Sequence, residues 1–224
     1  MFQKKFLTYA ICCAALAGLV LFIGRAQAEL SSNPTVSFSL DFPGSDPSHY
    51  IIAVSNDGHS SYQSDGKLGR QDTPGDIEEF DFTLSPATTK QIFDLAKKAH
   101  YFEGQIDSKK KVASTGEKTL TFSDGTRNNK AAFNYSSVAA VQDLTRIFQG
   151  LSSTLEFGRR LQYCYHHEKL ALNEQLTNME NAQRDHQLSD VTPILPILNE
   201  ISKDQTVVNV ARAKAMRLAS TKGN

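Results

Sequence analysis

The chain has 224 residues, a formal net charge of zero and 40% hydrophobic side chains, a size that suits one or two domains. The apolar fraction excludes a wholly disordered chain, and the balance of 24 basic and 24 acidic side chains argues against binding of nucleic acid through a basic face. Three cysteines are too few for a disulfide-dense scaffold. We therefore expect a globular protein that does not take nucleic acid as a partner.

The first residues have the pattern of an export signal. Lys4 and Lys5 precede a long uncharged run, and Ala26-Gln27-Ala28 supplies the small-x-small pattern that signal peptidase accepts. The sequence therefore predicts a signal peptide over residues 1–28 and a periplasmic or secreted protein. Because the apolar run approaches the length that spans a bilayer, an uncleaved N-terminal anchor is the alternative, and only then would the membrane be a partner. Both interpretations place the remaining residues outside the cytoplasm.

Residues 29–150 alternate strand and helix patterns. Apolar side chains at every second position over 36–42 predict a strand with one buried face, and Asn56-Asp57-Gly58 predicts the tight turn of a hairpin. Ser85-Pro86 predicts the start of a helix, since serine caps free amide groups and proline suits the first helical position. A second hairpin turning at Asp124-Gly125 and a second helix after Ser136 or Ser137 follow. We predict an α+β domain, an antiparallel sheet of about five strands with two helices on one face.

Residues 151–224 are predicted to form a C-terminal helical extension. One amphipathic helix of about 30 residues is expected from Leu151 to about Gln187, followed by two shorter helices, one ending near Ile201 and one beginning after Asp204. Its apolar stripe consists of Leu161, Tyr165, Leu172, Leu176 and Met179. Either the last two helices cover this stripe, or another chain does, in which case the stripe is the candidate interaction surface.

The residue types that bind metals occur together in one place. Cys164 lies near His166, His167 and Glu168, and on a helix Cys164 shares a face with His167 or Glu168 while His166 points away. Cys164, His167 and Glu168 are therefore the metal candidates. No further ligands follow at a suitable spacing, so the alternative is a half-buried thiol beside surface histidines, and we expect no cofactor.

Two charged loops allow a functional and a structural interpretation. Asp72, Asp76, Glu78 and Glu79 could supply oxygen ligands to calcium, although the EF-hand spacing is absent and an acidic loop also keeps a surface solvated. Residues Lys109–Lys111 predict a solvated loop tip, with contact to an anionic lipid or polymer as the alternative.

Two segments resemble known families. The Asp-Gly hairpins and the Ser-Pro helix, carried by Tyr50–Tyr62, Phe82–Phe102 and Leu120–Phe148 behind a signal peptide, resemble exported bacterial domains of unknown function. This resemblance brings no catalytic residues. Leu195-Pro196-Ile197-Leu198, with Asp204 and Ala211-Arg212, resembles a single HEAT-type repeat, but one repeat does not imply a solenoid because stacked neighbours are needed to bury a core.

No complete catalytic motif occurs in the sequence. The function predicted from it is that of an exported, non-enzymatic protein of the cell envelope, acting as a protein-interaction or binding module with an unknown protein partner. Two alternatives belong to other classes. One is a hydrolase or other enzyme with a site assembled from distant residues. The other is an inhibitor of an extracellular hydrolase, which would present loop 65–78 or loop 105–115.

Overall fold

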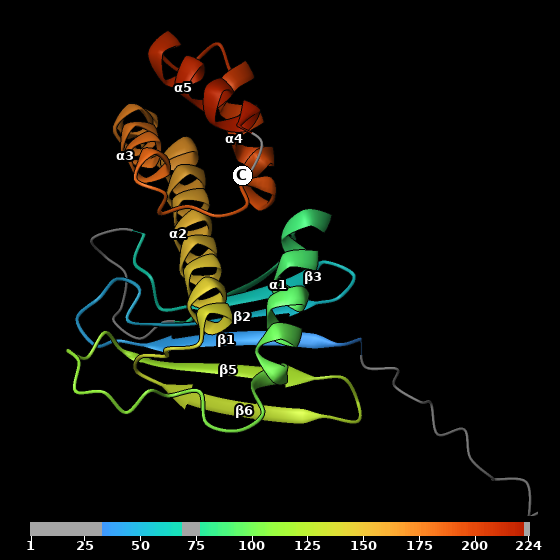
Figure 1. Ribbon diagram of the computed structural model, residues 1–224. Coiled ribbons are helices and arrows are strands. Elements are labelled where there is room, and N and C mark those ends of the chain that lie inside the picture. The colour runs from blue at the N-terminus through green and yellow to red at the C-terminus, as the bar shows by residue number, and fades with distance from the viewer. Residues whose placement is uncertain (1–32, 69–76, 222–224) are drawn as a thin grey trace, which may run out of the picture. The chain divides into compact units, whose positions relative to one another are not determined.

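The computed structural model describes residues 33–68 and 77–221 (Figure 1). The predicted signal peptide over 1–28 lies outside these ranges. Contacts within the chain define a compact unit that spans Ser32–Asn224. Among the described residues, no helix has both the length and the apolar character needed to cross a membrane.

Six antiparallel strands form one sheet in the order β4-β3-β2-β1-β5-β6. The strands are β1 (Thr35–Asp41), β2 (His49–Ser55), β3 (His59–Ser64), β4 (Glu78–Thr83), β5 (Glu117–Ser123) and β6 (Asn128–Phe133). The predicted α+β class is confirmed, with six strands where about five were expected. Strands β3 and β6 carry few large apolar side chains, so the alternation that identifies a strand is weak there.

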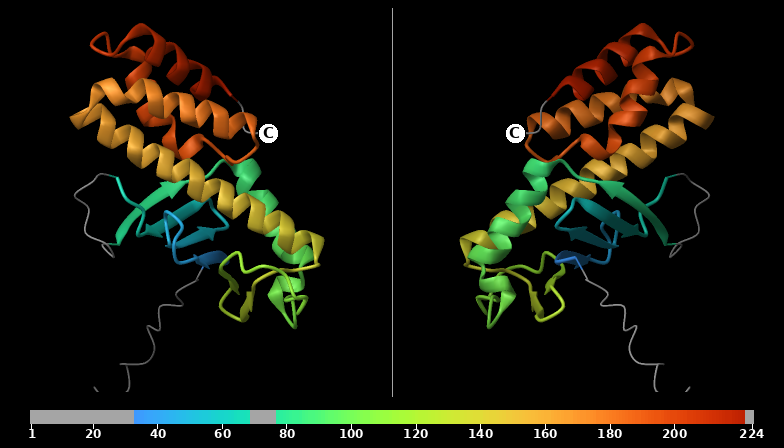
Figure 2. Two further views of the ribbon diagram at one scale, coloured as in Figure 1. Left: turned by 90° about the vertical axis from the view of Figure 1, so that its left-hand side faces the viewer. Right: turned by 90° about the vertical axis from the view of Figure 1, so that its right-hand side faces the viewer.

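One face of the sheet is apolar and covered, and the other is polar. Phe38 of β1 lies between Ile52 of β2 and Leu120 of β5, and all three are fully buried. The next residue along β1, Ser39, lies on the other face beside Thr119. Helices α1 (Pro86–Lys98) and α2 (Ala139–His167) pack on the apolar face, and Figure 2 shows the helices on one side of the sheet. The alternation of burial along each strand therefore fixes which face carries the core.

Local signals in the sequence act as expected at the turns and at the first helix. Gly58 and Gly125 have φ angles of 89° and 86°, which the tight turns after β2 and β5 require. The Ser85 side chain accepts a hydrogen bond from the Thr88 amide at the N-terminus of α1. Both predicted hairpins and the Ser-Pro helix start are confirmed.

The helical region differs from the prediction. The helix expected after Ser136 or Ser137 and the helix expected from Leu151 are a single helix, α2, which ends at His167. After a 3-10 turn, η2 (Lys169–Ala171), the chain continues as α3 (Leu172–Arg184). The expected helix through Gln187 is therefore wrong, because Glu168 has non-helical backbone angles and the apolar spacing simply resumes in α3. The predicted division between residues 29–150 and 151–224 falls in the middle of α2.

A second core lies beyond the sheet. Helix α3, a 3-10 turn η3 (Thr192–Ile194) and helices α4 (Leu195–Lys203) and α5 (Asn209–Ser220) enclose it together with the C-terminal half of α2. Two glycines on α2 let η3 and the loop after α3 pack closely against this helix. A Cβ atom on Gly158 would collide with Ile194, and one on Gly150 would collide with Ser189. Because α2 contributes to both cores, it joins the sheet to the helical region.

Candidate functional site

The apolar stripe predicted as an interaction surface is covered within the chain. Leu161, Leu172, Leu176 and Met179 are each 0% exposed and belong to the second core with α4 and α5. Tyr165 packs partly buried against the same core, and the Lys169 ammonium lies 4.8 Å from the centre of its ring. The described structure thus corresponds to the intramolecular alternative, and it leaves no free stripe for another chain.

The three metal candidates do not form a closed ligand set. Cys164 is buried, whereas His167 and Glu168 are exposed. Burial, helped by the nearby carboxylates of Glu168 and Glu174, raises the pKa of the Cys164 thiol, which disfavours the thiolate that metals bind. In the described ranges, no three His, Cys, Asp or Glu side chains converge as metal ligands would.

The calcium candidates are only partly described. Asp72 and Asp76 lie outside the described residues. Glu78 is placed, and its carboxylate forms an ion pair with Arg159 of α2, 2.8 Å from Nη2. The loop 65–78, named for the inhibitor alternative, likewise lies partly outside the described ranges. Glu78 is therefore assigned to an ion pair in this structure.

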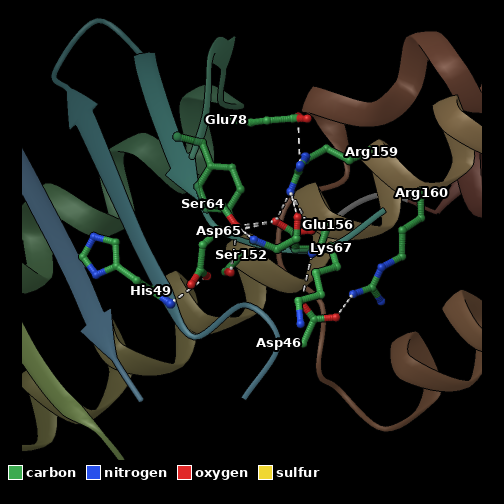
Figure 3. A network of polar contacts seen from close by, with 12 residues as sticks. Asp46, His49, Ser64, Asp65, Lys67, Glu78, Ser152, Glu156, Arg159 and Arg160 are labelled. Atoms are coloured by element: carbon green, nitrogen blue, oxygen red, sulfur yellow. Dashed lines mark hydrogen bonds and ion pairs between the residues drawn. The ribbon is translucent and has the colours of Figure 1, made fainter. Parts of the chain in front are cut away.

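A buried polar network connects α2 to β3 (Figure 3). At its centre the Glu156 carboxylate accepts hydrogen bonds from Tyr62 Oη at 2.9 Å and Ser64 Oγ at 2.8 Å. Arg159 Nη1 donates to both carboxylate oxygens, at 2.8 and 2.9 Å. The Glu156 and Arg159 side chains are only 4% and 8% exposed. We refer to Tyr62, Ser64, Glu156 and Arg159 as the Glu156 network.

The network also fixes both ends of the connection between β3 and β4. Arg159 Nη1 donates to the Gly66 carbonyl at 3.2 Å, and Nη2 binds Glu78 at the start of β4. A Cβ atom on Gly66 would lie 2.6 Å from the Glu156 carboxylate, so a larger residue here would displace this buried group. One arginine therefore holds two segments of the sheet against α2.

The chemistry of the Glu156 network is that of a clamp. Burial, with the Glu156 charge adding to it, raises the pKa of Tyr62 well above its usual value, so the phenol stays protonated and donates. The carboxylate is occupied by donors on both oxygens, and it is shielded from solvent. The one buried polar atom left without a partner in the described structure is Nε of Arg159. In the described structure this enclosed group holds α2 against β3.

A hollow with a volume of about 790 Å³ lies where α1, α2, α3 and α5 meet. It receives basic side chains from three helices and from the loop after α3. We call it the arginine cleft and define it by Arg146, Arg184, His186 and Arg217. Its volume falls within the range of about 300–1,000 Å³ that is typical of ligand pockets.

The carboxylates of the arginine cleft are already engaged. Arg217 binds Glu180 at 2.7 Å, and Arg146 binds Asp143 at 2.8 Å. Asp190 accepts hydrogen bonds from the amides of Ser85 and Thr192, at 2.7 and 3.0 Å. Burial alone would raise the pKa of Asp190, but these hydrogen bonds outweigh burial and lower it, so the group stays ionised.

Arg184 and His186 are the unpaired groups of the cleft. No hydrogen bond or ion pair joins either side chain to the described parts of the chain, and both are exposed. His186 also has a left-handed backbone, with φ of 56°. Three arginines and two carboxylates, Glu180 and Asp190, line the cleft. Asp143, beside the lining, neutralises Arg146 and Glu180 neutralises Arg217, so Arg184 is the arginine of the cleft without an ion-pair partner in the described residues.

The loop after α3 holds the cleft in shape. Thr154 Oγ1 donates to the Ser189 carbonyl at 2.6 Å, and the Ser189 amide lies against the glycine at position 150 of α2. Asp190 ties the same loop to the N-terminus of α1 through the Ser85 amide. The arginines are thus carried by elements that are joined by hydrogen bonds across the cleft.

A second hollow, of about 520 Å³, runs along α1. Beside it the 3-10 turn η1 (His100–Phe102) has left-handed backbone angles at all three residues, and it stacks Tyr101 on Phe122 with ring centres 4.5 Å apart. Arg127 covers Tyr101 at 3.9 Å and is bound by Asp124. Of the basic side chains that line this hollow, Arg127 is neutralised by Asp124 and Lys90 by Asp94, whereas Lys97 makes no hydrogen bond or ion pair within the described residues.

Sequence reasoning did not find the arginine cleft. Its arginines belong to three different helices, and no spacing in the sequence joins them. The structure shows a left-handed turn at His186 and a glycine at position 150 against which the loop after α3 packs. Neither feature identifies a ligand. Among known proteins, no family model matches the chain, and no curated protein does.

Proposed function

We propose that the protein is an exported, non-enzymatic binding module whose ligand is a small organic anion held in the arginine cleft. The observation that carries this proposal is the unpaired guanidinium of Arg184 in a preformed cleft that two further arginines line. Planar guanidinium groups match carboxylates and phosphates, to which they can donate two parallel hydrogen bonds. The ligand class is therefore a molecule that bears carboxylate or phosphate groups.

The arginines that already have partners remain able to contribute. The Arg146 and Arg217 side chains are largely exposed, and exposed ion pairs contribute little free energy. Arg217 also uses only Nε and Nη2 on Glu180 and keeps other N–H groups for a ligand. A ligand carrying two acidic groups could therefore contact Arg184 together with one of these arginines.

The export part of the proposal rests on the N-terminal pattern. The basic head, apolar run and small-x-small triplet over residues 1–28 support delivery to the periplasm or the medium. A protein partner in the cell envelope also stays a prediction, and the covered stripe on α2 and α3 gives it no surface. We expect the fusion of residues 1–28 to a reporter to direct export.

The binding test uses residues 32–224, which contain both cores. We expect citrate, succinate, pyrophosphate or inorganic phosphate to raise the unfolding temperature, and the best of the four to give a measurable Kd by calorimetry. Substitution Arg184→Gln should weaken that Kd about tenfold or more, because hydrogen bonds to charged groups contribute about 1.5–3 kcal/mol. Arg184 has no partner in the described structure, so the substitution breaks no structural contact.

The matched control is Lys203→Gln. Lys203 is exposed on α4, has no partner in the described residues and lies outside the cleft, so the substitution changes the net charge equally. It should leave the Kd unchanged. The proposal is contradicted if none of the four anions binds, or if both variants weaken binding to the same extent.

A further inference from the structure

One end of the sheet gathers exposed apolar side chains. Of the large hydrophobic residues that are exposed in the described structure, Phe42, Val112, Tyr135 and Val138 are 37–44% exposed. They belong to four segments: the end of β1, the loop before β5, the end of β6 and the start of α2. Since Asp41 pairs with Glu117 and Lys118 with Phe133, the last residues of β1 and β6 and the first of β5 share one end of the sheet (Figure 1).

Three consecutive lysines project from the same end. The Ser108 amide donates to the Tyr135 carbonyl at 2.9 Å, and the Thr115 amide donates to the Asn134 side chain at 3.0 Å. These two hydrogen bonds fix both ends of the loop 108–115 beside the end of β6. Lys109, Lys110 and Lys111 form its tip and are exposed, with no side-chain partner in the described residues.

Acidic groups also lie at this end of the sheet, but none belongs to the lysine tip. Asp46, Asp65 and Glu78, at the ends of the neighbouring strands, are held by Arg160, by the Ser48 and His49 amides and by Arg159. Asp107 comes just before the loop 108–115, and Glu117 begins β5. Asp41 is paired with His49 at 2.5 Å. The tip itself therefore presents only positive charge, and Val112 follows the lysines directly.

We infer that this end of the sheet docks on an anionic lipid surface. Lysine ammonium groups are attracted to anionic headgroups, while exposed valine and aromatic side chains insert at the level of the headgroups. Charge complementarity selects this occupant, because the lysines lack partners of their own and lie beside the apolar groups. The surface is distinct from the arginine cleft, which lies among the helices, and it does not depend on the function proposed for that cleft.

The test is sedimentation of residues 32–224 with vesicles at low salt. We expect binding to vesicles of equal parts phosphatidylglycerol and phosphatidylcholine, little binding to pure phosphatidylcholine, and release at high salt. Each lysine near an anionic surface contributes about fivefold to the binding constant, so Lys109→Gln, Lys110→Gln and Lys111→Gln together should lower it about a hundredfold. Val112→Ser should lower it about tenfold through lost apolar insertion.

The matched control combines Lys97→Gln, Lys98→Gln and Lys203→Gln, which remove the same charge from other exposed sites. This variant should bind as the unsubstituted protein does. The inference is overturned if anionic vesicles do not sediment the protein, if neutral vesicles bind it equally well, or if the two triple variants lose binding to the same extent. Circular dichroism of each variant separates lost docking from lost folding.

Discussion

Substitution Glu156→Ala should lower the free energy of unfolding by about 3–5 kcal/mol, because it leaves the buried guanidinium of Arg159 without its main partner. Ser64 loses its acceptor in the same step, and Tyr62 keeps only Ser152 Oγ, 3.0 Å away. Both hydroxyl groups are buried, and an unsatisfied buried donor adds its own desolvation cost. Urea unfolding of residues 32–224, followed by circular dichroism, measures the change.

Two further variants separate the buried pair from the exposed one. Glu78 also binds Arg159, but it is 58% exposed, so Glu78→Gln should cost less than about 1 kcal/mol. The double variant Glu156→Leu with Arg159→Leu should recover much of the loss, because an apolar pair leaves no buried charge. A cost below about 1 kcal/mol for Glu156→Ala would show that the network does not clamp α2 to the sheet.

Substitution Leu176→Ala should lower the free energy of unfolding by about 2–5 kcal/mol. Leu176 is 0% exposed in the second core, and the shorter side chain would leave a cavity that the surrounding helices fill only in part. If the stripe were instead an open surface awaiting another chain, the same substitution would change stability very little. Thermal and urea unfolding distinguish the two cases.

Met216→Ala is the control for this core. Met216 lies on α5 with 59% of its side chain exposed, so its removal should change stability by less than about 0.5 kcal/mol. Equal effects of Leu176→Ala and Met216→Ala would contradict the packing of α3 against α5. A large effect of Leu176→Ala alone would confirm that the C-terminal helices cover the stripe.

The sheet could be predicted from the sequence because its signals are local. Alternating side chains along β1, the glycines at 58 and 125, and the Ser85-Pro86 start of α1 each act within a few residues. Backbone geometry at a turn or a helix start depends on those residues alone. The same alternation indicates which face of each strand is buried, whereas the order of the strands, with β1 beside β5, was not predicted.

The break between α2 and α3 could not be predicted in this way. Apolar residues keep a helical spacing from Leu161 through Leu172, and residues 159–187 contain no proline or glycine to mark an end. The helix ends at His167, and Leu161 and Leu172 enter the same core from two different elements. Such a tertiary requirement leaves no local signal.

The candidate sites show the same contrast between features with a local sequence signal and features that depend on tertiary contacts. The hydrogen bond between Glu156 and Tyr62 joins residues that are far apart in the sequence. The close contact of Gly66 with the Glu156 carboxylate is likewise visible only in the folded structure. The metal candidates are close in sequence but differ in exposure, since Cys164 is buried while His167 faces solvent. Proximity in sequence was therefore a poor guide to a site on a long helix.

The most direct test of the proposed binding function observes the arginine side chains themselves. In NMR spectra of residues 32–224, the Nε–H signals of Arg184 and Arg217 should shift and saturate as citrate or pyrophosphate is added. The signals of Arg127, bound by Asp124, and of Arg212, outside the cleft, should stay in place. Shifts of equal size at all four arginines, or no saturable shift at Arg184, would contradict an anion site in the arginine cleft.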